Sequence, residues 1–227
     1  DDLGKVKGIG DKRLGKLMLP DSARTIVEQI IEGRQVEETS QPTAVAQGSP
    51  LPLNHRKPEP GKLDLAFIIG HQYEPWNPDT VAQAGIGGSE TMAMHLARLL
   101  AARGHAVRLY GHCTANMEGM FDGVLYLDAS RYRDVECDVM IASRTPEAVD
   151  DACGLKAKAS ILWIHDIHVG DRLNLQRDRR FDRILALSQW HKALLSRAYP
   201  LMNPDKIVVT RNGIDLSRFE GTEERDP

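Results

Sequence analysis

The chain has 227 residues, of which 41% are hydrophobic, and its formal net charge is −3. This length and composition suit one domain with a sizeable core, and the balanced charge gives no indication of a nucleic-acid or membrane partner. The sequence contains no apolar run long enough to span a bilayer and no signal-peptide pattern. Its three cysteines, Cys113, Cys137 and Cys153, form no CxxC pair, so we expect reduced thiols in a cytoplasmic protein rather than a disulfide framework or a zinc site.

The first 62 residues predict a small helical extension followed by a linker. Within residues 1–35, the segment "DSARTIVEQIIEGR" has Asp21 or Ser22 as a candidate N-cap, and Gly33 suits the end of the helix. Residues 36–62 then carry five prolines among Ser, Thr, Gln and Glu, with no aromatic residue. This composition is typical of a linker, or of a strap lying on a surface.

One segment of the extension, "KVKGIGDKRLGKLM", resembles a helix-hairpin-helix element, in which a Gly-Ile-Gly turn presents backbone N–H groups to a nucleic-acid phosphate. The motif occurs once, no aromatic residues are interleaved with it, and the rest of the chain has no basic bias. We therefore favour two other interpretations, the tail of an upstream domain or a unit that packs on the following domain. We expect no nucleic-acid partner.

The main domain is expected to begin at residue 63, where "LDLAFIIG" is a continuous apolar run typical of a strand buried on both faces. Apolar residues at helical spacing predict a helix over residues 89–103, ended by Gly104. Further strands are predicted in "AVRLYG", "GVLYLD", "CDVMIAS", "SILWIH", "DRILALS" and "DKIVVTRNG", with a second helix over residues 189–199 capped by Ser188. This alternation predicts an α/β fold with a doubly wound, mainly parallel Rossmann-like sheet over residues 63–213.

A glycine cluster, Gly85, Gly87 and Gly88, directly precedes the first helix of this domain. In such sheets ligands bind outside the carboxyl ends of the strands, and glycines at a helix start let a phosphate approach free backbone N–H groups. The loop is too long for the G-x-G-x-x-G turn of dinucleotide folds and lacks the Gly-Lys of a Walker loop. The alternative is that the glycines only allow close packing of the helix on the loop. Ser89 is expected to cap the helix or to contact phosphate, and Glu90 to support the first helical turn.

Three segments carry a family resemblance: "GIGGSETMAMHLARLLAARGHAVRLY", "ILWIHD" and "FDRILALSQWHKALLSRAYPLMNPDKIVVTRNGIDLSRF". In this order they resemble the N-terminal domain of retaining GT-B-fold glycosyltransferases, the large family that includes sucrose synthases and many bacterial sugar transferases. The resemblance covers residues 63–219. It implies two Rossmann-like domains that face each other across a cleft. The N-terminal one mostly binds acceptor, and the C-terminal one holds the nucleotide sugar through an E-x7-E motif.

The resemblance also implies that this chain is only the N-terminal half. Residues 214–227 would be the crossover towards an absent C-terminal domain, and the chain starts with Asp1 rather than Met, so we expect a piece of a longer polypeptide that is inactive by itself. The implied reaction transfers a sugar from a UDP- or GDP-sugar, with retention, to a carbohydrate, lipid or protein acceptor, as in polysaccharide biosynthesis. No metal and no covalently bound cofactor are expected. The alternative is a non-catalytic scaffold or assembly domain that keeps the GT-B shape.

By the same resemblance, His165 and Asp166 are the candidate catalytic residues. His165 would contact a hydroxyl of the donor sugar or lie near the reacting carbon, and the alternative is a histidine bonded to loop backbone. Asp166 would bind acceptor hydroxyls or cap a helix, and His168 is a weaker candidate of this kind. The backbone N–H groups at Gly87 and Gly88, with Ser89, would bind the donor phosphate, where negative charge develops as the nucleotide leaves.

Acceptor-binding residues are predicted at two other places. Arg144 and Thr145 follow a strand, where an arginine can hold a carboxylate or phosphate of the acceptor, unless it forms a surface salt bridge. Tyr73 and Trp76, with His71, lie in the long loop after the first strand, where aromatic rings suit stacking on sugars. Asn212 and Gly213 are expected to form the hinge between the two domains.

The segment "DRLNLQRDRRFDR", residues 171–183, holds five arginines with three aspartates between them. We expect a solvated face in which these charges pair with one another. The alternative is a surface for an anionic acceptor or for peripheral contact with a membrane.

Overall fold

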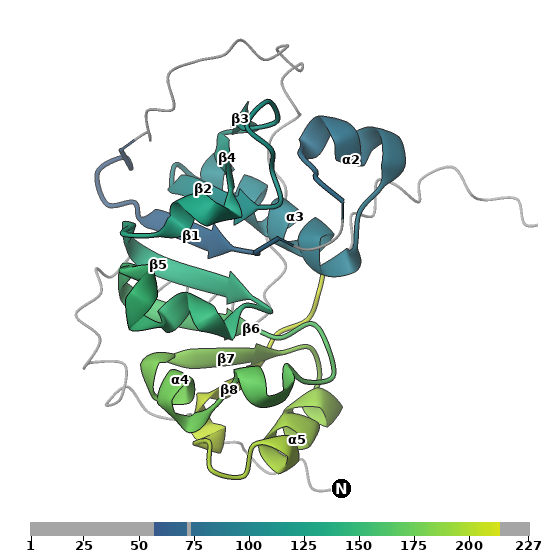
Figure 1. The fold of residues 1–227 in the computed structure, drawn as a ribbon, viewed down its shortest axis with the longest axis vertical. Helices are drawn as coiled ribbons and strands as arrows, with labels where there is room; N and C mark the ends of the chain where they lie inside the picture. The colour runs from purple at the N-terminus through teal and green to yellow at the C-terminus, as the bar shows by residue number, and fades with distance from the viewer. Residues whose placement is uncertain (1–56, 72–73, 214–227) are drawn as a thin grey trace, which may run out of the picture.

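The structure is a computed structural model that describes residues 57–71 and 74–213 (Figure 1). The predicted helical extension, the helix-hairpin-helix segment, most of the linker, Tyr73 and the crossover at 214–227 lie outside the described residues. The described residues form one eight-stranded sheet with the order β3-β4-β2-β1-β5-β6-β7-β8. All neighbouring strands are parallel except β3 and β4, so the predicted α/β fold with a mainly parallel sheet is confirmed.

Each strand predicted from an apolar run is present in the sheet. The run from 64 to 68 is buried on both faces as β1, and the six residues of β2 are all buried, which is why both segments lack polar alternation. The strands are β1 (Asp64–Ile68), β2 (Ala106–Gly111), β3 (Gly119–Phe121), β4 (Val124–Asp128), β5 (Glu136–Ser143), β6 (Lys156–Trp163), β7 (Arg183–Ala186) and β8 (Ile207–Val209).

Strand β3 was not predicted from the sequence. It has three residues, pairs antiparallel with β4, and joins it through Asp122 and Gly123, which both have positive φ angles (48° and 78°). Positive φ at both central residues is what a two-residue hairpin turn requires, and Asp-Gly is a favoured sequence for that turn. The strand itself is too short to show a periodicity.

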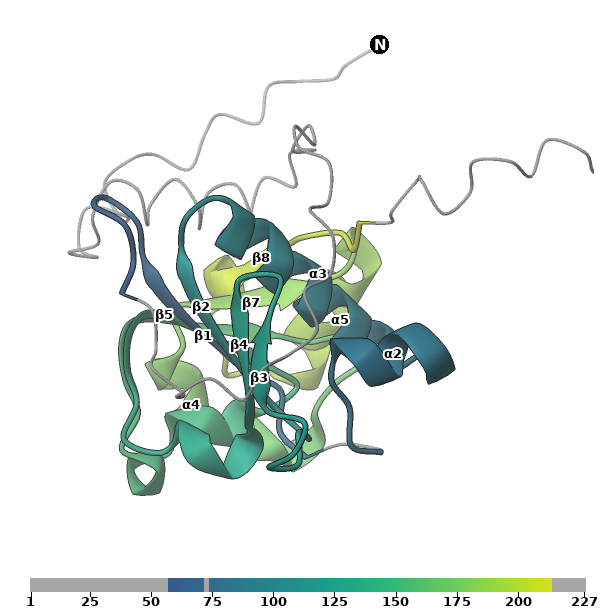
Figure 2. The same cartoon turned by 90° about the horizontal axis from the view of Figure 1, so that it is seen from above.

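Four helices are described: α2 (Pro78–Ala84), α3 (Gly88–Ala102), α4 (Leu175–Arg180) and α5 (Gln189–Ala198). The two predicted helices correspond to α3 and α5 within one residue at each end. Helix α2 was missed, although Asn77 caps it through Thr80 and Pro78 occupies its first turn. It has no buried residues, and Figure 2 shows it projecting from the body of the molecule.

Helices cover both faces of the sheet, as expected for a doubly wound domain. On one face, Ala93, Ala97 and Leu100 of α3 belong to a core cluster with Phe67 of β1. On the other face, Leu195 of α5 packs in a second cluster that contains residues of β1, β6 and β7. The chain moves from β1 outward to β2 and β4, and then returns to β5 on the other side of β1. This reversal between β1 and β5 is the topological switch point, where open α/β sheets bind ligands.

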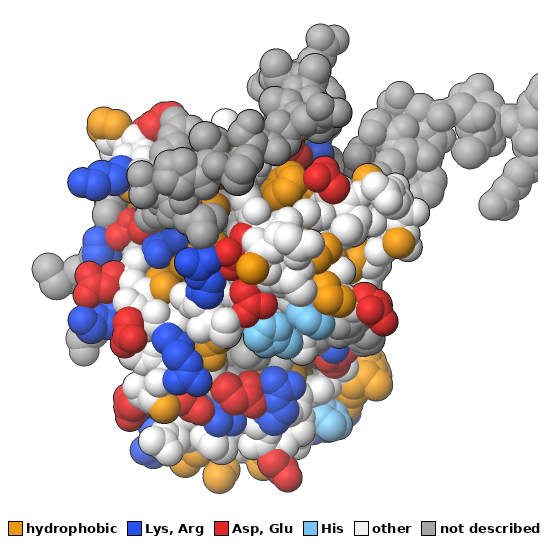
Figure 3. Space-filling view, turned by 45° about the horizontal axis from the view of Figure 1, so that its top comes forward, with side chains coloured by type: hydrophobic (Ala, Val, Ile, Leu, Met, Phe, Trp, Pro, Cys, Tyr) orange, Lys and Arg blue, Asp and Glu red, His pale blue; other side chains and the backbone are white. Residues whose placement is uncertain are grey.

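The arginine-rich segment forms a salt-bridged surface, but its arginines pair with carboxylates outside the segment rather than with one another's neighbouring aspartates as expected. Arg172 Nε donates to Glu147 Oε1 at 2.7 Å, and Arg177 Nη2 donates to Asp150 Oδ2 at 2.6 Å. Their partners come from the short 3-10 helices at 146–153, not from the aspartates within the segment. On the face in Figure 3, acidic and basic side chains are interspersed.

The three cysteines are buried free thiols in the structure. Burial raises the pKa of the Cys113 and Cys137 thiols to about 12, so both are protonated and unreactive at neutral pH.

Candidate functional site

The candidate site lies at the carboxyl edge of the sheet, beside the switch point. Three segments meet there: the start of α3, residues 144–145 after β5, and residues 165–166 after β6. In Figure 1 the arrowheads of β5, β6 and β7 point towards this edge, and α2 and the start of α3 lie on the same side.

Arg144 connects these three segments. Its Nε donates to Asp166 Oδ2 at 2.7 Å, its Nη1 donates to Ser89 Oγ at 2.9 Å, and Nη1 also lies 3.4 Å from Glu90 Oε1. The backbone of Arg144 has φ 60°, a left-handed conformation that costs a non-glycine residue about 1–3 kcal/mol. The ion pairs offset this strain and fix the first turn of α3 relative to the end of β6.

Glu90 is the negative partner within the helix start, and it is only 1% exposed. Its Oε2 accepts a hydrogen bond from Ser89 Oγ at 2.8 Å. A Cβ at Gly87 would overlap this carboxylate, so the glycine leaves room for it. The N-cap of α3 is Gly87, with no side-chain cap, so the predicted capping role of Ser89 is wrong. The reason is that its hydroxyl is held by Glu90 and Arg144 instead.

The first turn of α3 offers unpaired backbone donors. The first hydrogen bond of the helix runs from Thr91 N to Gly87 O at 2.9 Å, so the N–H groups of residues 88–90 precede the intrahelical ladder. A Cβ at Gly88 would meet nothing within 4 Å, so the space beside this residue is open. Such a helix start attracts an anion through its free N–H groups and its dipole.

His165 follows β6 directly and packs on Trp163, with 4.4 Å between the ring centroids. Both of its ring nitrogens are buried, and neither has a hydrogen-bond partner among the described residues. Loop backbone therefore does not satisfy this histidine. Burial, followed by the nearby Arg144 cation, lowers the pKa of His165 to about 4, so the ring is neutral at pH 7. A neutral imidazole has one donor and one acceptor nitrogen that can receive a hydroxyl group.

Two of the predicted acceptor residues are used within the fold. The Thr145 hydroxyl donates to the backbone oxygens of Ile69 (3.1 Å) and Ser143 (3.0 Å). Trp76 is 5% exposed and lies in the core, edge-on to Tyr126. Neither side chain is presented to a ligand at this edge, and Tyr73 lies outside the described residues.

The remaining predicted residues are placed at the periphery. His71 bonds to Asp128 Oδ2 through Nε2 at 2.9 Å, and His168 Nδ1 accepts from Gly170 N at 3.0 Å. Asn212 and Gly213 are exposed after β8.

His191 is a buried residue of the site that the sequence reasoning missed. It is 5% exposed, its Nδ1 accepts from Leu187 N at 3.2 Å, and its backbone N–H donates to the capping Ser188 Oγ at 3.0 Å. Burial lowers its pKa, while its contact with the backbone of Ile167 and Asp166 has the opposite effect. It thereby links the first turn of α5 to the loop that carries Asp166. The S-x-x-H spacing was the available signal in the sequence.

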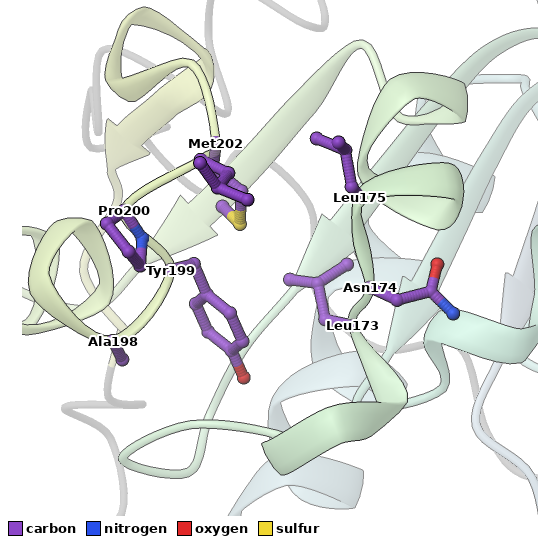
Figure 4. Close-up of a pocket in the computed structure, with 8 residues that line it drawn as sticks. Leu173, Asn174, Leu175, Ala198, Tyr199, Pro200 and Met202 are labelled. Carbon is purple, nitrogen blue, oxygen red and sulfur yellow. The ribbon is translucent and has the colours of Figure 1, made fainter.

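Two adjoining cavities lie near the other end of α5: one of about 180 Å³, drawn in Figure 4, and one of about 360 Å³ that also reaches His168, Gly170 and Asp171. Figure 4 shows Leu173 and Leu175 on one side of the smaller cavity, facing Tyr199 and Met202. The Tyr199 hydroxyl fixes this region, because it accepts from Val169 N at 3.0 Å and donates to Gly170 O at 3.1 Å. The ten residues of α5 span about 15 Å, which separates the smaller cavity from the candidate site at the helix start.

Within the described part of the chain, no group of three or more His, Cys, Asp or Glu side chains is arranged to hold a metal ion. None of the described helices is both long and apolar enough to cross a bilayer.

Comparisons with known proteins give little beyond this geometry. No protein-family model and no curated protein matches the chain. Among solved structures, the Anabaena protein HepE in complex with UDP-glucose is similar at 11% identity with a TM-score of 0.43, and HepE in complex with UDP at 12% with 0.40. Each match covers 68% of this chain and 45% of HepE, so the chain spans less than half of that protein. These identities and TM-scores are too low to carry a functional argument. The candidate site is inferred from the topology of the α/β sheet and the contacts at its carboxyl edge.

Proposed function

We propose that this chain is the acceptor-side half of a retaining GT-B glycosyltransferase, which transfers a sugar from a UDP- or GDP-sugar to an acceptor. The observation that carries the proposal is His165, a half-buried neutral histidine whose two buried ring nitrogens lack partners among the described residues, next to Arg144 at the switch point. Leaving two buried polar atoms unpaired is unfavourable unless a ligand or water bonds to them. The three sequence segments that resemble this family support the same assignment.

The start of α3 would receive the donor phosphate. As the sugar–phosphate bond breaks, negative charge grows on the diphosphate, and preorganised donors aimed at it lower the barrier. The free N–H groups at Gly88 and Ser89 are such donors. Because Arg144 Nη1 bonds to Ser89 Oγ, we assign Arg144 to the phosphate end of the site rather than to the acceptor.

His165 and Asp166 would hold the two sugars. The neutral ring of His165 would exchange hydrogen bonds with a hydroxyl of the donor sugar. Asp166 has a half-exposed carboxylate oriented by Arg144, and it would accept a hydrogen bond from the acceptor hydroxyl. The remaining donor contacts, including the E-x7-E motif, would come from the second domain, which moves about a hinge at Asn212 and Gly213.

Several parts of the proposal extend beyond this site. We propose a cytoplasmic enzyme of polysaccharide biosynthesis that needs no metal, no covalently bound cofactor and no nucleic acid. The acceptor is a carbohydrate, lipid or protein, and peripheral contact with a membrane belongs to the lipid case. The division into residues 1–35, 36–62, 63–213 and 214–227 belongs to the same proposal.

One observation favours a second candidate, a non-catalytic scaffold of the same shape. The buried carboxylate of Glu90 already complements the positive end of the α3 dipole, and it would repel a phosphate.

The decisive experiment uses a longer polypeptide in which this chain is joined to the proposed second domain. It is incubated with UDP- and GDP-sugars and a cell extract as acceptor source, and nucleotide release is followed for the natural sequence and for His165→Ala. Release from one donor that the variant loses supports the glycosyltransferase. The absence of release from every donor would favour the scaffold.

A further inference from the structure

Trp190 is an aromatic side chain that the proposed site does not yet use. It is 63% exposed, whereas the other two tryptophans of the chain, Trp76 and Trp163, are 5% and 4% exposed. Ile167 is also 62% exposed. Two large apolar side chains that are exposed to solvent at the edge of the candidate site indicate a surface that a ligand or partner covers.

Both residues lie at the carboxyl edge of the sheet, on neighbouring segments. Trp163 of β6 is paired with Leu185 of β7, so the loop that continues from β6 lies beside the start of α5. Ile167 belongs to that loop, and Trp190 is the second residue of α5.

The contacts of His191 bring these two segments together. Its buried ring lies near the backbone of Asp166 and Ile167, although its Nε2 makes no hydrogen bond among the described residues, and its Nδ1 accepts from Leu187 N. The Ser188 cap fixes the same first turn. Trp190 therefore lies on a capped helix start beside the loop that carries Asp166, the residue proposed to bind the acceptor.

Polar side chains are exposed on the same two segments as Trp190 and Ile167. Among them are Asp166, His168 and Gln189. A flat aromatic face with hydrogen-bonding side chains beside it complements a pyranose ring, which has an apolar C–H face and an edge of hydroxyl groups.

Other occupants fit less well. A lipid surface that carries negative charge would meet the carboxylates of Asp166 and Asp171, which are both exposed. A protein partner would need about 800 Å² from this side, far more than two side chains offer.

We propose that Trp190, together with Ile167, is the stacking platform for a sugar ring of the acceptor, which is then a carbohydrate. The ring would stack on the indole and direct one hydroxyl to Asp166. This inference rests on the proposed function, which identifies the Asp166 end of the site as the acceptor end. It gives Trp190 the sugar-stacking role that the sequence suggested for Tyr73 and Trp76.

The kinetic test uses the longer polypeptide with its donor sugar and carbohydrate acceptor. Trp190→Ala is expected to raise the acceptor KM by about tenfold, the loss of one aromatic contact, and to change the donor KM far less. Trp190→Phe should retain most of the affinity, and Trp190→Leu should behave like the alanine variant because it has no flat face.

Leu201→Ala is the matched control, since Leu201 is 77% exposed and lies after the far end of α5. An unchanged acceptor KM in Trp190→Ala, or an equal effect of Leu201→Ala, would overturn the platform.

A binding test separates this inference from the proposed function. Tryptophan emission is recorded while maltoheptaose, cellohexaose or chitohexaose is added at millimolar concentration. A blue shift in the natural sequence that is absent in Trp190→Phe supports the platform even if no donor is turned over, in which case only the proposed function fails. No shift with any of the three oligosaccharides, while nucleotide release occurs, would reject the platform and leave the glycosyltransferase.

Discussion

Arg144 shows how single residues build this site. Its left-handed backbone, φ 60°, turns the guanidinium back over the sheet edge, where it meets carboxylates from two other segments. Neither the strained backbone nor the buried Glu90 partner follows from the local sequence "IASRTP". The sequence placed Arg144 at a strand end correctly, but its partners depend on segments 54 and 22 residues away.

The two glycines at the start of α3, Gly87 and Gly88, differ in a way that tests the phosphate site. A Cβ at Gly88 meets nothing within 4 Å, so Gly88→Ala should leave the free energy of unfolding unchanged or raise it by up to about 1 kcal/mol. The same methyl group would stand where a phosphate approaches, so the donor KM should rise. Urea denaturation and donor kinetics of the longer polypeptide measure the two effects.

Gly87→Ala is the contrasting variant, because its Cβ would displace the buried Glu90 carboxylate. It should lower the free energy of unfolding. If Gly88→Ala destabilised the protein without changing donor use, the glycines would serve only the packing of helix on loop.

His165 predicts a pH dependence of stability. Its pKa is lowered from 6.5 to about 4 in the folded chain, so between these values the unfolded chain takes up a proton that the folded chain does not. The contribution of His165 to the free energy of unfolding is therefore fully present above pH 6.5. It decreases as the pH drops towards 4, by about 3 kcal/mol at most.

His165→Gln removes this titrating group, so the free energy of unfolding of the variant should fall less steeply between pH 7 and pH 5. Urea denaturation at pH 7 and pH 5 measures the difference, and a decline equally steep in the variant would assign the effect to other groups. His105 and His191, whose pKa values burial also lowers, account for the slope that remains.

At the scale of secondary-structure elements, the sequence predicted the strands and helices whose apolar residues follow a local pattern. Apolar runs such as "LDLAFIIG" indicated the parallel strands because both faces of these strands are covered. The hairpin strand β3 and helix α2 were missed, since three residues and an amphipathic turn without buried side chains leave little periodicity. The burial of Trp76 was also missed, because a loop residue enters the core only through distant elements such as β4.

Helix α5 offers a test of how an element positions the site. Ser188 Oγ accepts from His191 N at 3.0 Å, and Ser188→Ala should cost about 1 kcal/mol of stability through the lost cap. The variant should also loosen the turn that carries Trp190 and raise amide hydrogen exchange at residues 166–168.

Ser188→Asp is the control, because aspartate is an equally good cap. Protection of residues 166–168 should return with it. If exchange in this loop stayed the same in both variants, the loop would be held without the help of α5.

At the scale of the whole molecule, the reversal of strand order between β1 and β5 explains why the site is where it is. The ends of β5 and β6 and the start of α3 converge at this point, although they lie far apart in the sequence. The alternation of strands and helices predicted such an edge, and the family resemblance selected its residues. Burial, ion pairing and the exposed Trp190 came only from the three-dimensional arrangement.

The same geometry predicts that the 227-residue chain does not turn over a donor by itself. In the proposed function its edge would supply only one arginine and the N–H groups of a helix start for the diphosphate, and the facing domain would hold the nucleotide. We expect no nucleotide release from UDP- or GDP-sugars by the 227-residue chain, and release by the longer polypeptide under the same conditions. Isothermal titration with the active donor should give heat only with the longer polypeptide. Turnover by the 227-residue chain would instead mean that its own sheet edge forms a complete donor site, and the phosphate ligands would then have to lie among the residues of this chain.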